Sequence, residues 1–157
     1  MFLLILYFDG LCEPKNPGGV ATYGFVIYDG AHKVREDCGV VGAGMLGDDV
    51  SNNVAEYTAM IRGMECLVGL GHTSAITVRG DSQLAINQLL GKYAVKAKRL
   101  IPLYGIACGL KEKFKDVTFE WVPREKNEEA DELSRKAFRQ FLGKNLEAYR
   151  HYYFKDK

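Results

Sequence analysis

The chain has 157 residues, of which 26% are charged and 47% apolar, as expected of one globular domain with a sizeable core. A net charge of +1 excludes a surface that is basic all round, so a nucleic-acid contact would need a local patch. No apolar run approaches the roughly 20 residues that span a bilayer, and the apolar N-terminus lacks the features of a signal peptide. We therefore expect a cytoplasmic protein without membrane contact that acts as a monomer.

Three strands and a helix are predicted in the first half of the chain. The N-terminal run is continuously apolar, which is typical of a central strand covered on both faces, and Asp9 marks its end. Asp29-Gly30 is a hairpin signal between the next two strands, and Ser51 with the asparagines after it can cap the helix. The predicted strands are 2–9, 20–29 and 33–41, with a loop over 10–19, and the helix is 53–69.

The second half alternates strands with helices. Ser82 and Asn127 are placed to cap helices, and a basic turn over 91–99 separates two of them. A hairpin meander followed by β-α units predicts an α/β fold whose mixed five-stranded sheet is flanked by helices. The predicted strands are 75–80 and 117–122, and the helices are 83–90, 100–114 and 127–142.

A single domain is expected over residues 1–142, followed by a tail over 143–157. The tail combines four aromatic side chains with a basic excess, so it could stack on bases or pack on the surface of the same domain. We favour packing. Met1 lies directly before the first strand, which favours a free-standing enzyme over a fragment of a polymerase or integrase.

Four acidic residues occupy positions that folding alone does not explain. Asp9 and Asp81 follow apolar strands, Glu56 shares the apolar face of a helix, and Asp131 lies in the first turn of another. Turn and capping preferences could explain the three aspartates singly, but not a buried Glu56. Burying an unpaired carboxylate costs several kcal/mol, so a cluster implies a compensating partner. If the strands that precede Asp9 and Asp81 are parallel neighbours, the cluster suits Mg²⁺ or Mn²⁺ rather than zinc.

These acids lie in four short motifs that follow one another over residues 2–140. The motifs are Tyr7-Phe8-Asp9-Gly10 with Asn16-Pro17-Gly18-Gly19, Asn52-Asn53-Val54-Ala55-Glu56-Tyr57, Gly80-Asp81-Ser82-Gln83, and the run from Trp121 to Asp131. In this order they resemble the type 1 ribonuclease H family. The resemblance implies a ribonuclease H-like fold and endonucleolytic cleavage of the RNA strand of RNA/DNA hybrids, which leaves 5′-phosphate and 3′-hydroxyl ends.

The same resemblance implies two Mg²⁺ ions per site when substrate is bound, with Mn²⁺ as a substitute. Asp9 would bridge the ions, Asp131 would help hold the ion that activates water, and Glu56 and Asp81 would hold the ion at the leaving group. Amides would contact the minor groove and basic side chains the phosphates. The expected substrate-binding residues are Asn16, Ser51, Asn52, Asn53, Gln83, Lys92, Lys96, Lys98 and Arg124.

Two features depart from the family pattern. Many members carry a histidine in the loop before the last acid, where this chain has Arg124-Glu125-Lys126. Arg124 can act electrostatically but cannot shuttle protons near neutral pH. The basic protrusion of some members is reduced to the turn 91–99.

Cleavage of double-stranded RNA is an alternative function, because recognition by duplex shape would admit it. A non-catalytic nucleic-acid-binding module is another, although the intact set of acids argues against it.

Overall fold

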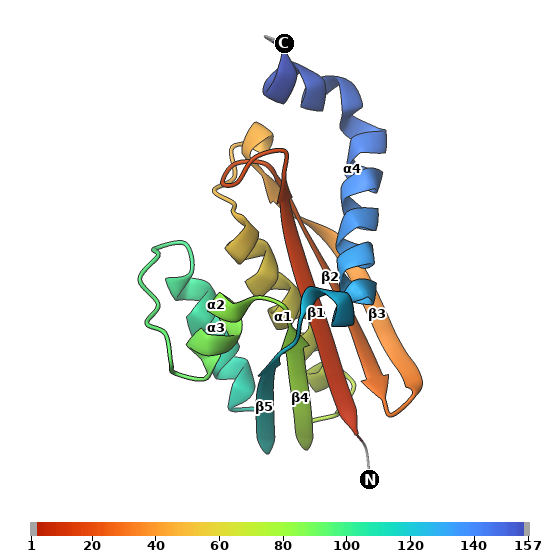
Figure 1. Ribbon diagram of the computed structural model, residues 1–157, viewed down its shortest axis with the longest axis vertical. Coiled ribbons are helices and arrows are strands. Elements are labelled where there is room, and N and C mark those ends of the chain that lie inside the picture. The colour runs from red at the N-terminus through yellow and green to blue at the C-terminus, as the bar shows by residue number, and fades with distance from the viewer. Residues whose placement is uncertain (1–2, 156–157) are drawn as a thin grey trace.

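The computed structural model describes residues 3–155 and contains a five-stranded mixed sheet in the order β3-β2-β1-β4-β5, with helices on both faces (Figure 1). The predicted fold class is therefore confirmed. In chain order the elements are β1 (Leu4–Glu13), β2 (Val20–Asp29), β3 (His32–Ala43), the short 3-10 turn η1 (Gly44–Leu46), α1 (Asn52–Gly69), β4 (Ala75–Gly80), α2 (Gln83–Leu89), α3 (Ile101–Lys111), β5 (Asp116–Trp121), the 3-10 turn η2 (Arg124–Lys126) and α4 (Glu128–Phe154).

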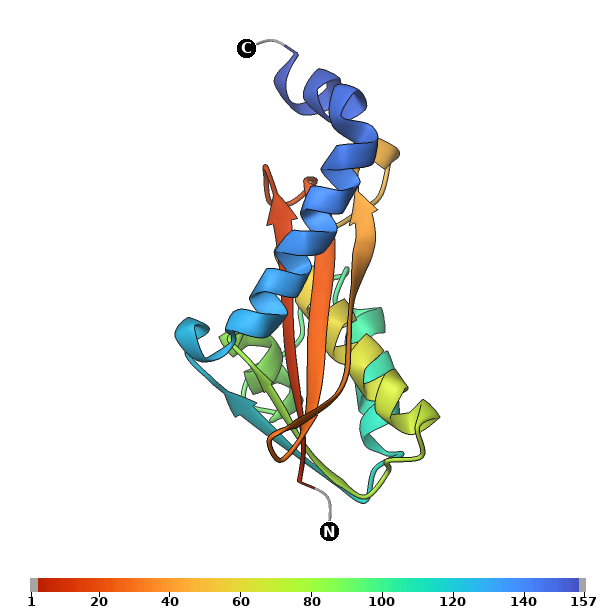
Figure 2. The ribbon, with the colours of Figure 1, turned by 90° about the vertical axis from the view of Figure 1, so that its right-hand side faces the viewer.

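The central strand β1 joins the two halves of the sheet. It pairs with β2 antiparallel and with β4 parallel, and β5 extends the parallel half. Short connections produce the antiparallel β1-β2-β3 part, whereas β4 and β5 each follow a helical crossover. Helix α1 packs on β1 and β2 on one face, and α3 packs against α1, whereas α4 crosses β1, β2 and β3 on the other face (Figure 2).

The main core lies between the sheet and α1. Leu6 and Phe8 of β1 and Met60 and Met64 of α1 are fully buried there. Removing each such side chain from water contributes about 1.5–3 kcal/mol, so this face of the sheet anchors α1 firmly. Among residues 3–155, no helix is both long enough and apolar enough to cross a membrane.

The first strand runs past its predicted end at Asp9. Residues 10–13 continue to pair with β2, from Gly10 opposite Tyr23 to Glu13 opposite Val20, which leaves only 14–19 as the connecting loop. The long partner strand supplies the hydrogen bonds that extend β1, and β3 likewise runs on to Ala43. Phe2, where the predicted strand begins, lies outside the described residues. Asp9 therefore lies within β1, beside the point where the shorter β4 ends.

The last helix also continues beyond its predicted end near Leu142. It reaches Phe154, with a break at Asn145, whose φ of −134° and ψ of 22° are not helical. Beyond the break, Tyr149 is buried among residues of β2, β3 and α4. The Tyr153 hydroxyl donates to the carbonyl of Gly18 at 2.8 Å and accepts from the backbone N–H of Met45 at 3.2 Å. Residues 146–154 thus contact the loops at one end of the sheet.

Candidate active site

Two glycines beside Asp9 let a helix approach the sheet closely from each face. A Cβ atom on Gly10 would lie 2.4 Å from the backbone of Ala55 and Glu56 in α1. Gly24 is the cross-strand partner of Asp9, and a Cβ atom there would lie 2.5 Å from the carbonyl oxygen of Ala130 in α4. Only glycine permits such contacts between backbones. The two helices that carry Glu56 and Asp131 therefore lie directly on the strands around Asp9.

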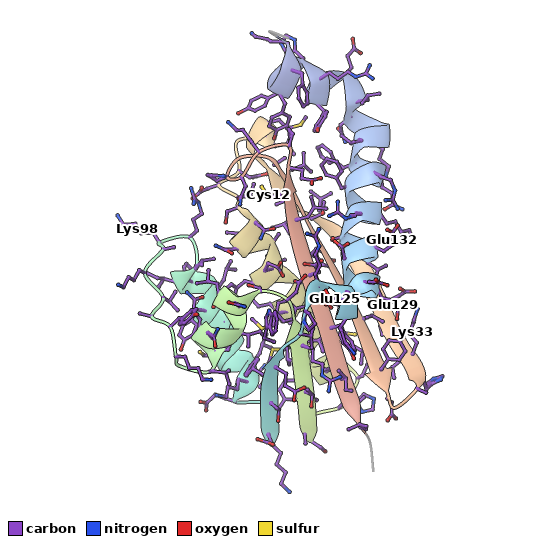
Figure 3. The ribbon with its side chains drawn as sticks, in the orientation of Figure 1. Cys12, Lys33, Lys98, Glu125, Glu129 and Glu132 are labelled. Atoms are coloured by element: carbon purple, nitrogen blue, oxygen red, sulfur yellow. The ribbon has the colours of Figure 1, made fainter. Side chains whose placement is uncertain are left out.

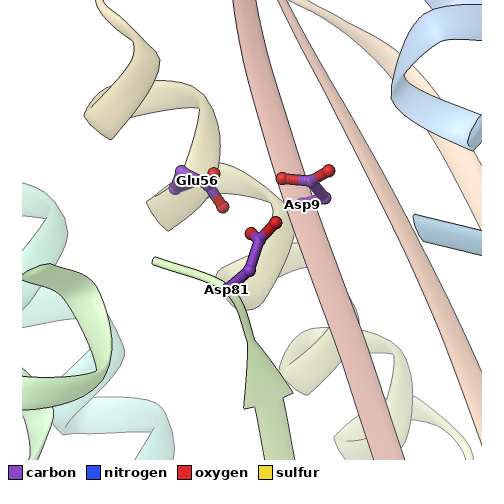
Figure 4. Close-up of side chains that lie close together, drawn as sticks. All are labelled: Asp9, Glu56 and Asp81. Atoms are coloured by element: carbon purple, nitrogen blue, oxygen red, sulfur yellow. The ribbon is translucent and has the colours of Figure 1, made fainter. Parts of the chain in front are cut away.

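Three of the four predicted acids meet at this point. Asp9, Glu56 and Asp81 each offer a carboxylate oxygen, and these oxygens lie within 4.8 Å of one another. Figure 4 shows them converging from β1, from α1 and from the connection after β4. Asp9 is 5% exposed and Glu56 is 4% exposed, while Asp81 is half-buried. We call these three residues the carboxylate trio.

The trio is electrostatically strained in the absence of a cation. Burial, followed by the charge of Asp81, raises the pKa of Asp9 to about 7. Burial, followed by the charge of Asp9, raises the pKa of Glu56 well above its usual range. The Glu56 Oε2 atom is buried and has no hydrogen-bond partner within residues 3–155. A bound divalent cation would neutralise the shared charge and use this oxygen, so the trio fits a hard metal ion.

Asp131 lies in the same cleft but outside the trio. Its carboxylate oxygens are 3.2 and 3.3 Å from the Nε atom of Arg135, one helical turn further along α4. It is nevertheless close enough to Asp9 for its charge to contribute to the raised pKa of that residue. Arg135 was not among the predicted site residues. Arg135 follows Asp131 by four residues on a predicted helix, and this spacing indicates that the two side chains can pair.

The four acids line a cleft of about 560 Å³ together with three of the predicted substrate residues, Asn52, Gln83 and Arg124. The exposed ring of Trp121 also lines it, and its indole N–H donates to the carbonyl of Asp81 at 3.2 Å. The other predicted substrate residues lie outside this lining. Asn16 accepts a hydrogen bond from the backbone N–H of Asn52 at 2.8 Å. Ser51 caps α1 by accepting from the backbone N–H of Val54 at 3.2 Å, and Asn53 lies in the first turn of that helix. Lys92, Lys96 and Lys98 are exposed between α2 and α3.

Asn127 connects the elements that carry the acids. It stands at the N-cap position of α4, but the prediction that its side chain caps the helix is wrong, because that side chain makes no capping hydrogen bond. Asn127 is only 2% exposed, and its Nδ2 donates to the carbonyl of Phe8 at 2.9 Å. A further hydrogen bond from its side chain to Asp81 lowers the pKa of that carboxyl, although burial dominates and raises it. The start of α4 is thus bonded to β1 beside Asp9 and to Asp81.

Replacing Asn127 is expected to weaken the binding of a divalent cation. Residues that orient metal ligands typically change metal affinity by about 10–100-fold when mutated, and we expect a loss in this range for Asn127→Ala. Isothermal titration of the protein with Mn²⁺ measures it. Asn145→Ala is the matched control, because it removes a bond from an asparagine amide to the carbonyl of Phe141, away from the site. Equal affinity in the two variants would contradict a role for Asn127 in the site.

Comparisons with known proteins agree with this geometry. A protein-family model described as "Reverse transcriptase-like" matches residues 8–137, a range that contains all four acids. The "Bifunctional protein Rv2228c" of Mycobacterium tuberculosis is 37% identical over 124 residues, which are 78% of this chain and 32% of that protein. "Ribonuclease HI" of Halobacterium salinarum is 37% identical over 134 residues, which are 83% of this chain and 62% of that protein. The chain thus spans about a third to three fifths of the length of these curated relatives.

Solved structures show the same fold over nearly the whole chain. The crystal structure of ribonuclease H1 from Halobacterium salinarum superposes with a TM-score of 0.78 at 33% identity, covering 87% of this chain and 98% of that one. The structure of LC11-RNase H1, a protein isolated from compost, in complex with an RNA/DNA hybrid gives a TM-score of 0.79 at 33% identity, covering 88% and 99%.

Proposed function

The chain belongs to the type 1 ribonuclease H family, and we propose that it hydrolyses the RNA strand of RNA/DNA hybrids to leave 5′-phosphate and 3′-hydroxyl ends. The observation that carries this proposal is the carboxylate trio in one cleft with Asp131. The complex of LC11-RNase H1 with an RNA/DNA hybrid supports the choice of substrate, because that protein shares the fold at 33% identity.

We propose that the cleft holds Mg²⁺, or Mn²⁺ in its place, with two ions present when substrate is bound. Asp9 feels the charge of Asp81, a hydrogen bond with Glu56 and the charge of Asp131, so it would be shared between the ions. Asp131 would serve the ion on the side of the water, and Glu56 and Asp81 the ion at the leaving oxygen. Bound there, the ions would supply the positive charge that activates water and stabilises the departing oxygen. The unpartnered Oε2 of Glu56 and the raised pKa of Asp9 support a ligand role for both residues.

The walls of the cleft suit an RNA-containing duplex. Asn52 and Gln83 line the cleft beside the acids, and their amides can both donate to and accept from a 2′-hydroxyl or a base edge. Asn16 uses its carbonyl oxygen to hold the N–H of Asn52, which leaves its own amide N–H groups for the substrate. Together, the amides in the cleft and that of Asn16 outside it would select a ribose strand.

Arg124 stands in the loop where many family members carry a histidine. It lines the cleft, and its charge partly offsets the rise that burial causes in the pKa of Asp81, so the two side chains interact. A guanidinium stays protonated at all physiological pH values. We therefore propose that Arg124 contributes positive charge toward the scissile phosphate and does not carry protons.

The decisive experiment compares matched RNA/DNA, RNA/RNA and DNA/DNA duplexes with Mg²⁺ and with chelator. We expect cleavage of the RNA strand of the hybrid only, with 5′-phosphate products, and none with chelator. Asp9→Asn protein purified in the same way controls for contaminating nucleases. Cleavage of RNA/RNA at the rate of the hybrid would show a double-stranded RNA nuclease, hybrid binding without cleavage would show a non-catalytic module, and cleavage of DNA/DNA alone would refute the assignment.

A further inference from the structure

The exposed stretch of residues 91–99, here called the basic segment, has little structure of its own. It carries Lys92, Lys96, Lys98 and Arg99, and the sequence has no acid between Asp81 and Glu112. The segment joins α2 to α3 without helix or strand, and all of it except Val95 is exposed. Figure 3 shows Lys98 on its outer edge, pointing away from the sheet. The carbonyl of Asn87 in α2 accepts from the backbone N–H groups of Lys92 and Tyr93 at 2.8 and 3.2 Å, which fixes the start of the segment. No helix or strand fixes the part that carries Lys96 and Lys98.

Besides these backbone bonds, three side-chain contacts within residues 3–155 hold the basic segment to the domain. Val95 packs against the main core. The Nε atom of Arg99 lies 2.7 Å from Asp49, but this ion pair is exposed, and such pairs contribute little. The third contact comes from the buried residue Gln88, whose Nε2 atom donates to the carbonyl of Ala94 at 3.3 Å. Ala94 lies between the lysines, so this contact fixes the middle of the segment.

Gln88 is in turn held by the helix that carries Glu56. Its side chain is 3% exposed, and its Oε1 accepts a hydrogen bond from the hydroxyl of Tyr57 at 2.5 Å. Tyr57 is fully buried in α1 and follows Glu56 in the chain. Because the hydroxyl donates to Oε1, the opposite end of the amide must face Ala94, where a donor is needed. A phenylalanine at position 57 would leave a buried acceptor unpaired and the amide free to turn.

We propose that Tyr57 and Gln88 are positioning residues for the substrate, which fix the basic segment relative to α1. The lysines would then meet the phosphates of the same duplex whose scissile strand lies beside Glu56. This inference rests on the proposed function and deepens it, because it assigns substrate affinity to a buried hydrogen-bonded link that touches no substrate. Since phosphate contacts by lysine release counterions, the link has a signature in the salt dependence of binding.

The test is Tyr57→Phe, measured by steady-state cleavage of an RNA/DNA hybrid at several salt concentrations. We expect KM to rise about five- to tenfold, as for loss of one buried hydrogen bond, with kcat unchanged. The slope of log affinity against log salt should become shallower by about 1 to 2, since each phosphate contact contributes about 0.9. Trypsin should cut after Lys92, Lys96 and Lys98 several-fold faster. Tyr23→Phe is the control, because the hydroxyl of this buried tyrosine donates to Asp37 in β3 instead.

Two further variants separate positioning from general destabilisation. Gln88→Met removes the donor to Ala94 at similar volume and should reproduce the effects of Tyr57→Phe. In a protein with Lys92, Lys96 and Lys98 all changed to alanine, Tyr57→Phe should add nothing to KM. The proposal is overturned if Tyr57→Phe leaves KM, the salt slope and the trypsin rate unchanged, or if it lowers kcat alone. It is also overturned if Tyr57→Phe raises KM equally in the protein that lacks Lys92, Lys96 and Lys98. If the parent protein does not cleave hybrids, the proposed function fails, and the trypsin rates still decide whether the link holds the segment.

Discussion

Asp9→Asn is expected to abolish hydrolysis and, in metal-free protein, to increase stability. The substitution keeps the shape of the side chain and removes a buried charge that lies beside Glu56 and Asp81. We expect the free energy of unfolding at pH 8 in chelator to rise by about 1–3 kcal/mol, because like charges in a buried site repel one another. The cleavage rate should fall at least about a thousandfold, since metal-held groups supply several kcal/mol to the transition state. Urea unfolding and hybrid cleavage measure the two effects.

The pH dependence of stability checks the cause of this gain. The pKa of Asp9 in the folded protein, about 7, lies above its ordinary value of 3.8, so the folded state binds more protons between these values. The free energy of unfolding of the metal-free parent should therefore fall as the pH rises from about 4 to about 7. The raised pKa of Glu56 acts in the same direction. Asp9→Asn should flatten the curve, and Asp116→Asn, which removes an exposed acid at the start of β5, should not. Parallel curves for parent and Asp9→Asn would contradict the electrostatic explanation.

Added Mg²⁺ should reverse the loss of stability in the parent. A ligand that binds only the folded state stabilises it in proportion to the logarithm of its concentration above Kd. The melting temperature of the parent at pH 8 should rise with Mg²⁺, and that of Asp9→Asn should rise much less. An equal rise in both proteins would show that the ion binds elsewhere.

The order of strands and helices could be predicted from local signals. The apolar N-terminal run, the hairpin signal at Asp29-Gly30 and the cap at Ser51 each correspond to an element of the structure. The extension of β1 could not be predicted, because Pro14 and the glycines near it are turn signals. The hydrogen bonds that keep residues 10–13 in the sheet come from β2. Element ends that depend on a partner strand are not visible in a local pattern.

The site was predictable to the extent that its residues carry charge. An acid on an apolar helix face, such as Glu56, is conspicuous, and the structure brings it together with Asp9 and Asp81. Asn127 was not recognised as a residue of the site, because an asparagine before a helix commonly caps that helix. Its actual partner is the carbonyl of Phe8, which lies 119 residues earlier in the chain. Such neutral long-range bonds leave no pattern in the sequence.

Gly10→Ala and Gly24→Ala should separate the roles of the two helices that flank Asp9. Each added methyl group would collide with helix backbone, at 2.4 Å in α1 and at 2.5 Å in α4, so the helix must shift. Both variants should lose about 1–3 kcal/mol of stability, as for other overpacked contacts. Gly10→Ala displaces Glu56, whereas Gly24→Ala displaces Asp131, which lies outside the trio.

The two shifts should therefore differ in their effect on metal binding. Gly10→Ala is expected to weaken Mn²⁺ binding by the free protein at least about tenfold, because it moves one of three ligands of the trio. Gly24→Ala should leave this affinity nearly unchanged and instead lower kcat by about 10–100-fold, since a small misplacement at the reacting centre has effects of this size. Gly143→Ala is the control, because nothing lies within 4 Å of the added methyl group in α4. If both glycine variants lost metal affinity and kcat in the same proportion, Asp131 would have to act as part of the metal site from the start, and the division between the trio and Asp131 would be wrong.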